Sequence, residues 1–183
     1  MSNYYYLVAQ LPAVVFSSDS KATLPISFDY FKDLCARFLD GDVLEQINSL
    51  SLEPPKEPAD TGFCFLNRWY AWERSLRLAL AQQRAAKMQK NFDCPEAATV
   101  TQDIQQLART ACAFDSPLEA EQFLNKERLK MIDEFAPIDA FCADAVFAYG
   151  VKLLLAARIQ KFDENAGMES YRIIYDQILG ESK

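Results

Sequence analysis

The sequence predicts an all-α protein of about seven helices, with room for a short extended segment at the N-terminus. Residues 63–90 contain neither glycine nor proline and are rich in Ala, Leu, Arg and Gln, which are strong helix formers. Residues 116–119 form a capping box with proline at the first helical position, which marks the start of another helix. Residues 69–84 and 146–161 read nearly alike, which indicates a duplicated helical unit.

The repeat predicts how the helices are grouped. Its identical pairs are Ala71/Ala148, Leu76/Leu153, Leu78/Leu155, Ala79/Ala156 and Gln83/Gln160. Because stacked copies bury each other's apolar faces, we expect these shared positions in the core. The predicted arrangement is a single domain over residues 1–183, made of two short-then-long helical units at about 27–93 and about 94–180.

The N-terminal part is the least regular. Residues 4–26 are rich in aromatic and β-branched side chains and are interrupted by Pro12 and Pro25. Residues 4–10 fit either a short helix or a strand, because the segment is too short for its periodicity to decide.

A first regular helix is predicted after Ser27, a residue that favours the N-cap position. Apolar side chains recur on one face through residues 28–39, at the spacing of an amphipathic helix: Phe28, Phe31, Leu34, Cys35, Phe38 and Leu39. Asp40 and Gly41 are expected to end this helix, and a shorter one follows over residues 43–50.

An extended connector is predicted next, because residues 53–58 hold three prolines. It leads into the long helix over residues 63–90. One line of side chains along that helix keeps a four-three spacing, which is typical of the seam of an antiparallel helical pair: Phe65, Trp69, Trp72, Leu76, Ala79 and Gln83.

Four helices are predicted in the second half of the chain, at about residues 95–113, 117–135, 138–162 and 168–179. Pro95 suits the first turn of the first of them, and Pro137 separates the second from the third. Residues 165–167, Asn-Ala-Gly, are interpreted as a stop signal before the last helix. Four side chains of that helix fall on one apolar face: Tyr171, Ile174, Tyr175 and Ile178.

Composition excludes many classes of enzyme. The chain has no histidine, so it cannot hold a Ser-His-Asp or Cys-His nucleophile system, a histidine-ligated zinc or a Glu-x-x-His di-iron site. It contains no glycine-rich phosphate loop, Walker lysine or nucleophile elbow. Its five cysteines lack Cys-x-x-Cys spacing and favour buried free thiols over disulfides or a thiolate metal site. We therefore expect no metal, no cofactor and no catalytic activity.

Charge and hydropathy restrict location and partners. No stretch is apolar enough to span a membrane, and the run over residues 4–16 lacks the basic start and the cleavage site of a signal peptide. We therefore expect a cytoplasmic protein without direct membrane insertion. The net charge of −7 disfavours nucleic acid as a partner.

One helix is basic within this acidic chain. Turning by about 100° per residue, the long helix brings four cations onto one arc: Arg74, Arg77, Arg84 and Lys87. We predict that this basic arc binds an acidic surface of a protein partner, because charge complementarity raises the association rate and fixes orientation. The alternative is that these cations pair within the chain or are simply solvated.

Carboxylates crowd the junction around Pro137: Asp133, Glu134, Asp139 and Asp144. If several of them converged with Asp163, they would form an oxygen-only site for a hard metal such as Mg²⁺ in a carboxylate-based helical enzyme. Such clusters also arise as first-turn charges that complement a helix dipole.

Aromatic residues suggest a third kind of site. Trp69 and Tyr149 would either line the pocket of a small-ligand-binding helical module or pack in the core. Residues 119–134 are interpreted as an exposed, ion-paired helix, and they predict no function.

Two segments carry a resemblance to a known family. The chain opens with Tyr4-Tyr5-Tyr6-Leu7-Val8-Ala9-Gln10-Leu11-Pro12-Ala13, and residues 147–158 read Phe-Ala-Tyr-Gly-Val-Lys-Leu-Leu-Leu-Ala-Ala-Arg, with Gly167 further on. These segments resemble a short bacterial family of unknown function that is encoded beside V-type ATPase genes. More distantly, they resemble the C subunit of V/A-type rotary ATPases, which is called d in eukaryotes.

The resemblance implies a non-catalytic helical protein, because the C subunit is a cap that joins the central stalk to the membrane rotor ring. Its aromatic-x-aromatic motif falls on Tyr4 and Tyr6, and its Ala-Tyr motif on Ala148 and Tyr149. The C subunit is longer, has three units and carries a Glu that residues 152–158 lack. The resemblance therefore implies an accessory or assembly role on stalk or rotor components of the ATPase.

Overall fold

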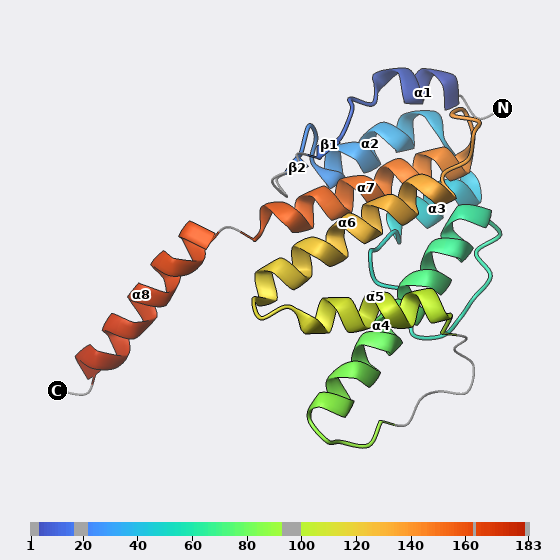
Figure 1. The fold of residues 1–183 in the computed structure, drawn as a ribbon. Coiled ribbons are helices and arrows are strands. Elements are labelled where there is room, and N and C mark those ends of the chain that lie inside the picture. Colours follow the sequence, from blue (N-terminus) through green and yellow to red (C-terminus); the bar gives the residue numbers. More distant parts are fainter. Residues whose placement is uncertain (1–3, 17–21, 93–99, 163, 182–183) are drawn as a thin grey trace.

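The computed structural model describes residues 4–16, 22–92, 100–162 and 164–181, and Figure 1 shows their fold. These residues form eight helices and one small hairpin of two strands. In chain order the elements are α1 (Tyr4–Gln10), β1 (Val15–Phe16), β2 (Ala22–Thr23), α2 (Phe28–Phe38), α3 (Gly41–Asn48), α4 (Cys64–Lys87), α5 (Gln102–Ala113), α6 (Pro117–Phe135), α7 (Ala143–Gln160) and α8 (Glu164–Glu181).

The all-α prediction is confirmed, because the structure is 70% helical. The segment that fitted either a helix or a strand is the helix α1. The hairpin that follows is minimal, with Val15 paired to Thr23 in antiparallel register. None of the helices in the described ranges combines the length and the apolar character that crossing a membrane requires.

Two helices begin where their capping residues predict. At the start of α2, the Oγ of Ser27 accepts the backbone N–H of Tyr30 at 3.1 Å. At the start of α6, the Oγ of Ser116 accepts the N–H of Glu119 at 3.4 Å. Each bond satisfies a first-turn N–H that the helix itself leaves unpaired. The end of α6 at Phe135 also agrees with the prediction.

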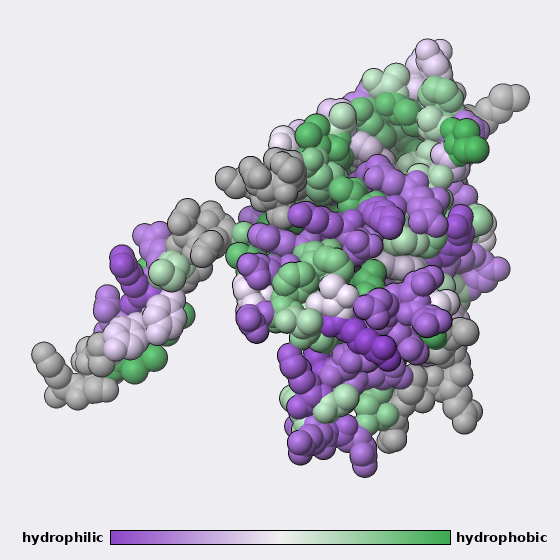
Figure 2. Space-filling view, viewed as in Figure 1, coloured by the Kyte–Doolittle hydropathy of each residue, from purple (hydrophilic) through white to green (hydrophobic). Residues whose placement is uncertain are grey.

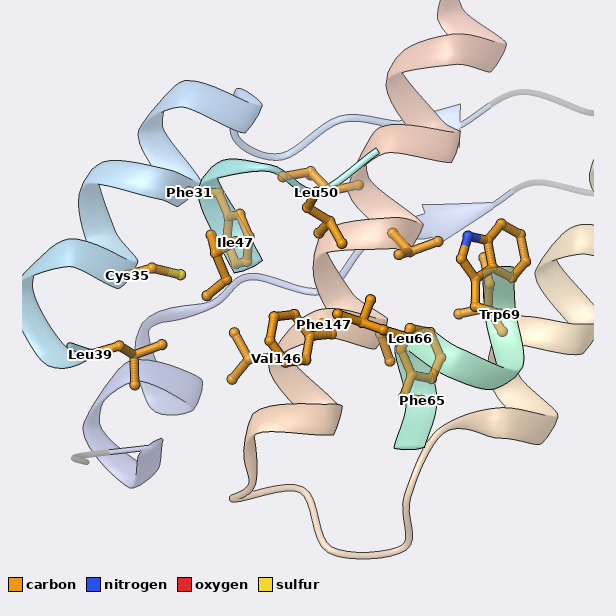
Figure 3. Close-up of a cluster of buried hydrophobic side chains, with 14 of the residues drawn as sticks. Phe31, Cys35, Leu39, Ile47, Leu50, Phe65, Leu66, Trp69, Val146 and Phe147 are labelled. Carbon is orange, nitrogen blue, oxygen red and sulfur yellow. The ribbon is translucent and has the colours of Figure 1, made fainter. Parts of the chain in front are cut away.

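The main hydrophobic core joins the N-terminal helices to α7. Figure 3 shows side chains from α2, α3, the first turns of α4 and the first turns of α7 meeting in one cluster. Its buried members include Phe31, Cys35, Leu39, Ile47, Leu50, Phe65, Leu66, Trp69, Val146 and Phe147. Burying each large apolar side chain stabilises the fold by about 1.5–3 kcal/mol relative to exposure.

A second cluster lies further along α4. It is formed by α4, α5 and the start of α6, with these buried members: Leu76, Ala79, Leu80, Ile104, Ala108, Ala111 and Leu124. Trp72 packs against both clusters. Residue 93 is where the first predicted helical unit was expected to end. Each cluster contains residues from before and after it, and α4 contributes to both clusters.

Close packing explains a glycine in α7. A Cβ on Gly150 would lie 2.6 Å from Cδ2 of Leu50 and 3.0 Å from Cε1 of Phe31. Since these distances are shorter than ordinary van der Waals contact, only a residue without a side chain fits here unless its neighbours shift. Gly150 aligns with Glu73 in the sequence repeat, so the two copies use this position differently.

The helix predicted over residues 138–162 begins later than expected, because α7 starts at Ala143. The carboxylate of Asp139 accepts the backbone N–H of Phe141 at 2.9 Å, and such a local turn competes with a helix. The side chain of Ile138 is fully exposed. No apolar burial of that side chain therefore favours a helix before Ala143.

The stop signal predicted at residues 165–167 is wrong, because these residues lie within α8. The interruption comes earlier, where the N–H of Phe162 bonds to the carbonyl of Ile159 at 3.1 Å and tightens the last turn of α7. A glycine inside a helix costs about 1 kcal/mol relative to alanine, which is too little to end α8.

The helix predicted over residues 95–113 is shorter in the structure. Its expected start at Pro95 lies outside the described residues, and α5 begins only at Gln102. Val100 and Thr101 are not helical, and Thr101 occupies the N-cap position with extended backbone dihedrals. A helix unbroken from residue 95 to residue 113 is therefore ruled out.

Candidate functional site

The basic arc runs along α4 from Arg74 to Lys87, and two of its cations bind backbone carbonyls. The guanidinium of Arg74 donates to the carbonyl of Pro55 in the proline-rich connector. The Nζ of Lys87 donates to the carbonyl of Cys112, at the end of α5, at 2.8 Å. Both side chains therefore have structural roles, because they attach neighbouring segments to α4.

Arg77 is the most strongly paired cation of the basic arc. Its Nε lies 2.9 Å from the carboxylate of Glu73, and its Nη1 lies 3.4 Å from that of Glu53. Burial by itself would lower the pKa of Arg77, but the hydrogen bonds and negative charges of Glu73 and Glu53 raise it above its ordinary value. Arg77 therefore stays charged, and its charge is largely balanced within the chain.

Glu73 is the centre of a buried ionic network between α4 and α6. Its side chain is 1% exposed and accepts hydrogen bonds from Nε and Nη2 of Arg128, both at 3.1 Å. Arg128 is itself 6% exposed, and its Nη1 also donates to Asn125 at 3.2 Å. Buried charges require such pairing, because removing either partner would leave the other uncompensated in the interior.

A cavity of about 330 Å³ lies beside this network, and we call it the arginine cavity. Four arginines from three helices line it, together with two glutamates: Arg77, Arg84, Arg128, Arg158, Glu53 and Glu121. The remainder of its wall is aliphatic and comes from Leu80, Ala81 and Leu124. Even when Glu73 is counted, four guanidinium groups face three carboxylates, so the cavity has a net positive charge.

Two of these arginines share one glutamate. The Nη1 of Arg128 and the Nη2 of Arg158 both donate to the same oxygen of Glu121, at 3.3 and 2.6 Å. The Nε of Arg158 is buried and has no hydrogen-bond partner. Unpaired buried N–H groups are rare in proteins, and leaving one costs about 1–3 kcal/mol.

Arg84 differs from the rest of the basic arc. Its side chain is exposed, and within the described ranges it has no hydrogen bond or ion pair. It lines the arginine cavity and also a smaller neighbouring hollow between α4, α5 and α6. Of the four predicted partner-binding residues, Arg84 is thus the one that forms neither a hydrogen bond nor an ion pair within the described residues.

The carboxylates near Pro137 have separate structural partners. Asp133 forms an ion pair with Lys152 of α7. Asp144 accepts the backbone N–H of Phe65 at 3.2 Å, which caps the first turn of α4 from the neighbouring helix.

These carboxylates give the hard-metal hypothesis no support. Asp139 bonds to the local turn described above, Glu134 is exposed, and Asp163 lies outside the described residues. Among the residues whose structure is described, no group of three or more Asp, Glu, Cys or His side chains could hold a metal ion.

Of the aromatic residues singled out from the sequence, Trp69 lies in the core and Tyr149 packs against it. Trp69 is fully buried, with its ring 5.7 Å from that of Trp72. Tyr149 packs 5.5 Å from the ring of Phe31, and its hydroxyl donates to the carbonyl of Pro12 at 2.8 Å. Burial and, secondarily, the nearby Cys35 thiol raise the pKa of Tyr149 to about 12. The core interpretation of Trp69 and Tyr149 therefore fits the structure better than a ligand pocket.

Helix α8 presents a second candidate surface, which we call the α8 stripe and define by Met168, Tyr171, Ile174 and Tyr175. Each of these four side chains is more than half exposed, and the rings of Tyr171 and Tyr175 stack with their centroids 6.0 Å apart. Figure 1 shows α8 directed away from the other helices. In Figure 2 its hydrophobic side chains gather along one edge of the helix, with hydrophilic ones along the other. Large exposed apolar patches of this kind usually mark interaction sites.

Sequence reasoning missed the part of α6 that faces the arginine cavity. The segment 119–134 was interpreted as exposed, but Leu124, Arg128 and Ile132 are all buried. Their spacing of four residues provides a signal, because it places the arginine within the apolar face of the helix. A cation in that position must have a buried acidic partner, and Glu73 supplies it.

Comparisons with known proteins add no functional assignment. No protein-family model matches the chain, and no match was found among curated proteins or among solved structures.

Proposed function

We propose that this chain is a non-catalytic helical protein that docks on a V/A-type rotary ATPase, as an accessory stalk element or an assembly factor. Docking would occur through the α8 stripe, and the partner would be a stalk or rotor component. The protein would act in the cytoplasm and reach the membrane only through the ATPase complex.

The observation that carries the docking proposal is the exposure of the α8 stripe. A helix that keeps tyrosine, isoleucine and methionine side chains on one exposed face matches the helix-in-groove mode of protein recognition. Tyrosines suit such a role because they bury a large apolar area while their hydroxyl groups can stay hydrated. The identity of the partner rests on the resemblance of residues 4–13 and 147–158 to the ATPase-associated families.

The basic arc adds a second, smaller contribution to this proposal. Arg84 is exposed and could pair with a carboxylate of the partner, which would steer association. Arg77 is a poorer candidate, since it is already held by Glu73 and Glu53. Reversal of charge at Arg77 would also disturb the buried network, so Arg84→Glu is the cleaner test of an acidic partner surface.

The proposal is tested by purifying the tagged chain from its native cells and measuring which ATPase subunits accompany it. We expect stalk or rotor subunits with the wild-type chain and their loss with Ile174→Asp, because a charge would have to be buried in the apolar interface. The matched control is Ile173→Asp, which changes the same residue type on the same helix. Ile173 is also exposed but lies about 100° away from Ile174, outside the α8 stripe.

Retention of the ATPase subunits by Ile174→Asp, or equal loss by both variants, would overturn docking through the α8 stripe. Absence of ATPase subunits from the wild-type purification, together with normal ATPase assembly after deletion of the gene, would overturn the choice of partner. Self-association of the purified chain that Ile174→Asp abolishes would show instead that a second copy covers the stripe.

A further inference from the structure

We propose that the arginine cavity is a binding site for a phosphate group, either free or carried by a small organic molecule. The cavity lies between α4, α6 and α7 and shares no lining residue with the α8 stripe. The basic arc supplies two of its arginines, Arg77 and Arg84, and the other two come from α6 and α7. The proposal does not depend on the docking function.

The first argument is the set of donors that remain unused. Each of the three nitrogens of Arg128 already donates to Glu73, Glu121 or Asn125. Arg158 uses its Nη2 for Glu121, and its Nη1 has no hydrogen bond within the described residues. Arg84, with the whole guanidinium fork, has no partner within the described residues. The lining of one cavity therefore offers strong donors on at least two arginines.

The second argument is charge. The arginines of the cavity cannot lose their protons near neutral pH, so the excess of guanidinium groups over carboxylates persists. Glu53, the partner of Arg77, is 70% exposed, and its carboxylate lies 3.4 Å from Nη1 of Arg77. It therefore offsets the positive charge of the cavity only weakly. An anion that entered would be attracted without having to displace the buried pair of Glu73 and Arg128.

Phosphate fits these donors better than a carboxylate does. A tetrahedral phosphate presents oxygens in several directions and can accept from two or three guanidinium forks at once, whereas a carboxylate offers two oxygens in one plane. The cavity, at about 330 Å³, is at the lower end of the range for small-molecule sites. It leaves room for a small organic group attached to the phosphate, against Leu80, Ala81 and Leu124.

The test uses the full chain and follows the arginine Nε–H signals by NMR at constant ionic strength. Inorganic phosphate is titrated first, followed by glycerol phosphate, with glycerol and citrate as comparison compounds. We expect saturable shifts with both phosphates, no shift with glycerol and weaker binding of citrate. Tighter binding of glycerol phosphate than of inorganic phosphate would support the proposal and identify an organic phosphate as the source.

Variants locate the site. Arg84→Gln is expected to weaken phosphate binding by about tenfold, because it removes a charged bidentate donor. Arg84→Lys keeps the charge without the fork and should lie between the wild type and Arg84→Gln. The control is Arg109→Gln on α5, an exposed arginine that does not line the cavity and should change affinity by less than about twofold. Since Arg84 and Arg109 are both exposed, neither change should alter the circular dichroism spectrum.

Three results would overturn the phosphate site. They are shifts that do not saturate, an equal loss of affinity in Arg84→Gln and Arg109→Gln, and tighter binding of citrate than of either phosphate. None of them involves a partner protein, so each would leave the docking proposal untouched.

Discussion

Replacing Glu73 by glutamine would leave the guanidinium of Arg128 in the interior without its main counter-charge. The two side chains are 1% and 6% exposed and are joined by two hydrogen bonds of 3.1 Å. Removing one partner of a buried ion pair costs about 3–5 kcal/mol. Arg128 would keep its bond to Glu121, which is 21% exposed, so we expect Glu73→Gln to fall at the lower end, about 3 kcal/mol.

The double variant Glu73→Leu with Arg128→Met tests the argument from burial more strictly than the single change does. It removes both charges and fills their space with apolar groups, so the desolvation cost of the pair disappears with its attraction. We expect its unfolding free energy to lie within about 1 kcal/mol of the wild-type value. The unfolding free energy of each variant is measured by urea unfolding followed by circular dichroism. The single variants Glu73→Leu and Arg128→Met complete a double-mutant cycle with the double variant.

The matched control for Glu73→Gln is Glu134→Gln, an exposed glutamate on α6 whose loss should change stability by less than about 0.5 kcal/mol. If Glu73→Gln cost less than about 1 kcal/mol, the pair would be behaving as a solvated surface ion pair, and the reasoning from burial would fail. A double variant as unstable as Arg128→Met alone would likewise refute the desolvation argument.

Three further predictions concern the rest of the fold and use the same urea assay. Gly150→Val should destabilise the chain by about 1–3 kcal/mol through overpacking against Leu50, and an unchanged midpoint would contradict the close contact. Asp144→Ala should cost about 1 kcal/mol, because the N–H of Phe65 loses its cap; no measurable loss would argue against that bond. Burial raises the pKa of Cys35 from 9.0 to about 12, so the folded chain holds a proton that the unfolded chain loses in this interval. Stability should therefore be complete below about pH 9 and decline by up to about 1.4 kcal/mol per pH unit above it, and Cys35→Ala should flatten that slope. A slope that Cys35→Ala leaves unchanged would exclude the thiol as its source.

Local signals in the sequence predicted most of the helices. Ser27 and Ser116 mark helix starts because each needs only its own side chain and the N–H groups three residues later. The errors arose where competing local bonds decided the boundary. Asp139 holds a turn that delays α7, and the glycine at residue 167 is too weak a signal to stop α8.

The sequence repeat predicted burial only in part. Leu76 and Ala79 are buried together with their counterparts Leu153 and Ala156. The other identical pairs are not uniformly buried, since Gln160 is exposed. Identity between the copies therefore reflects both packing and helix preference, and only the packed structure separates the two.

The amino-acid sequence by itself determined that the chain is helical, where its caps lie and that one arc of α4 is basic, since these follow from residue preferences and from a fixed rotation per residue. Only the tertiary structure decided which charged side chains form ion pairs with one another. Arg128 pairs with Glu73 across 55 positions of sequence and Arg158 with Glu121 across 37, so both pairs exist only once α4, α6 and α7 pack together. The same packing leaves Arg84 without a partner among the described residues and creates the arginine cavity, because the position of a charge along a helix does not specify which neighbour will lie opposite it.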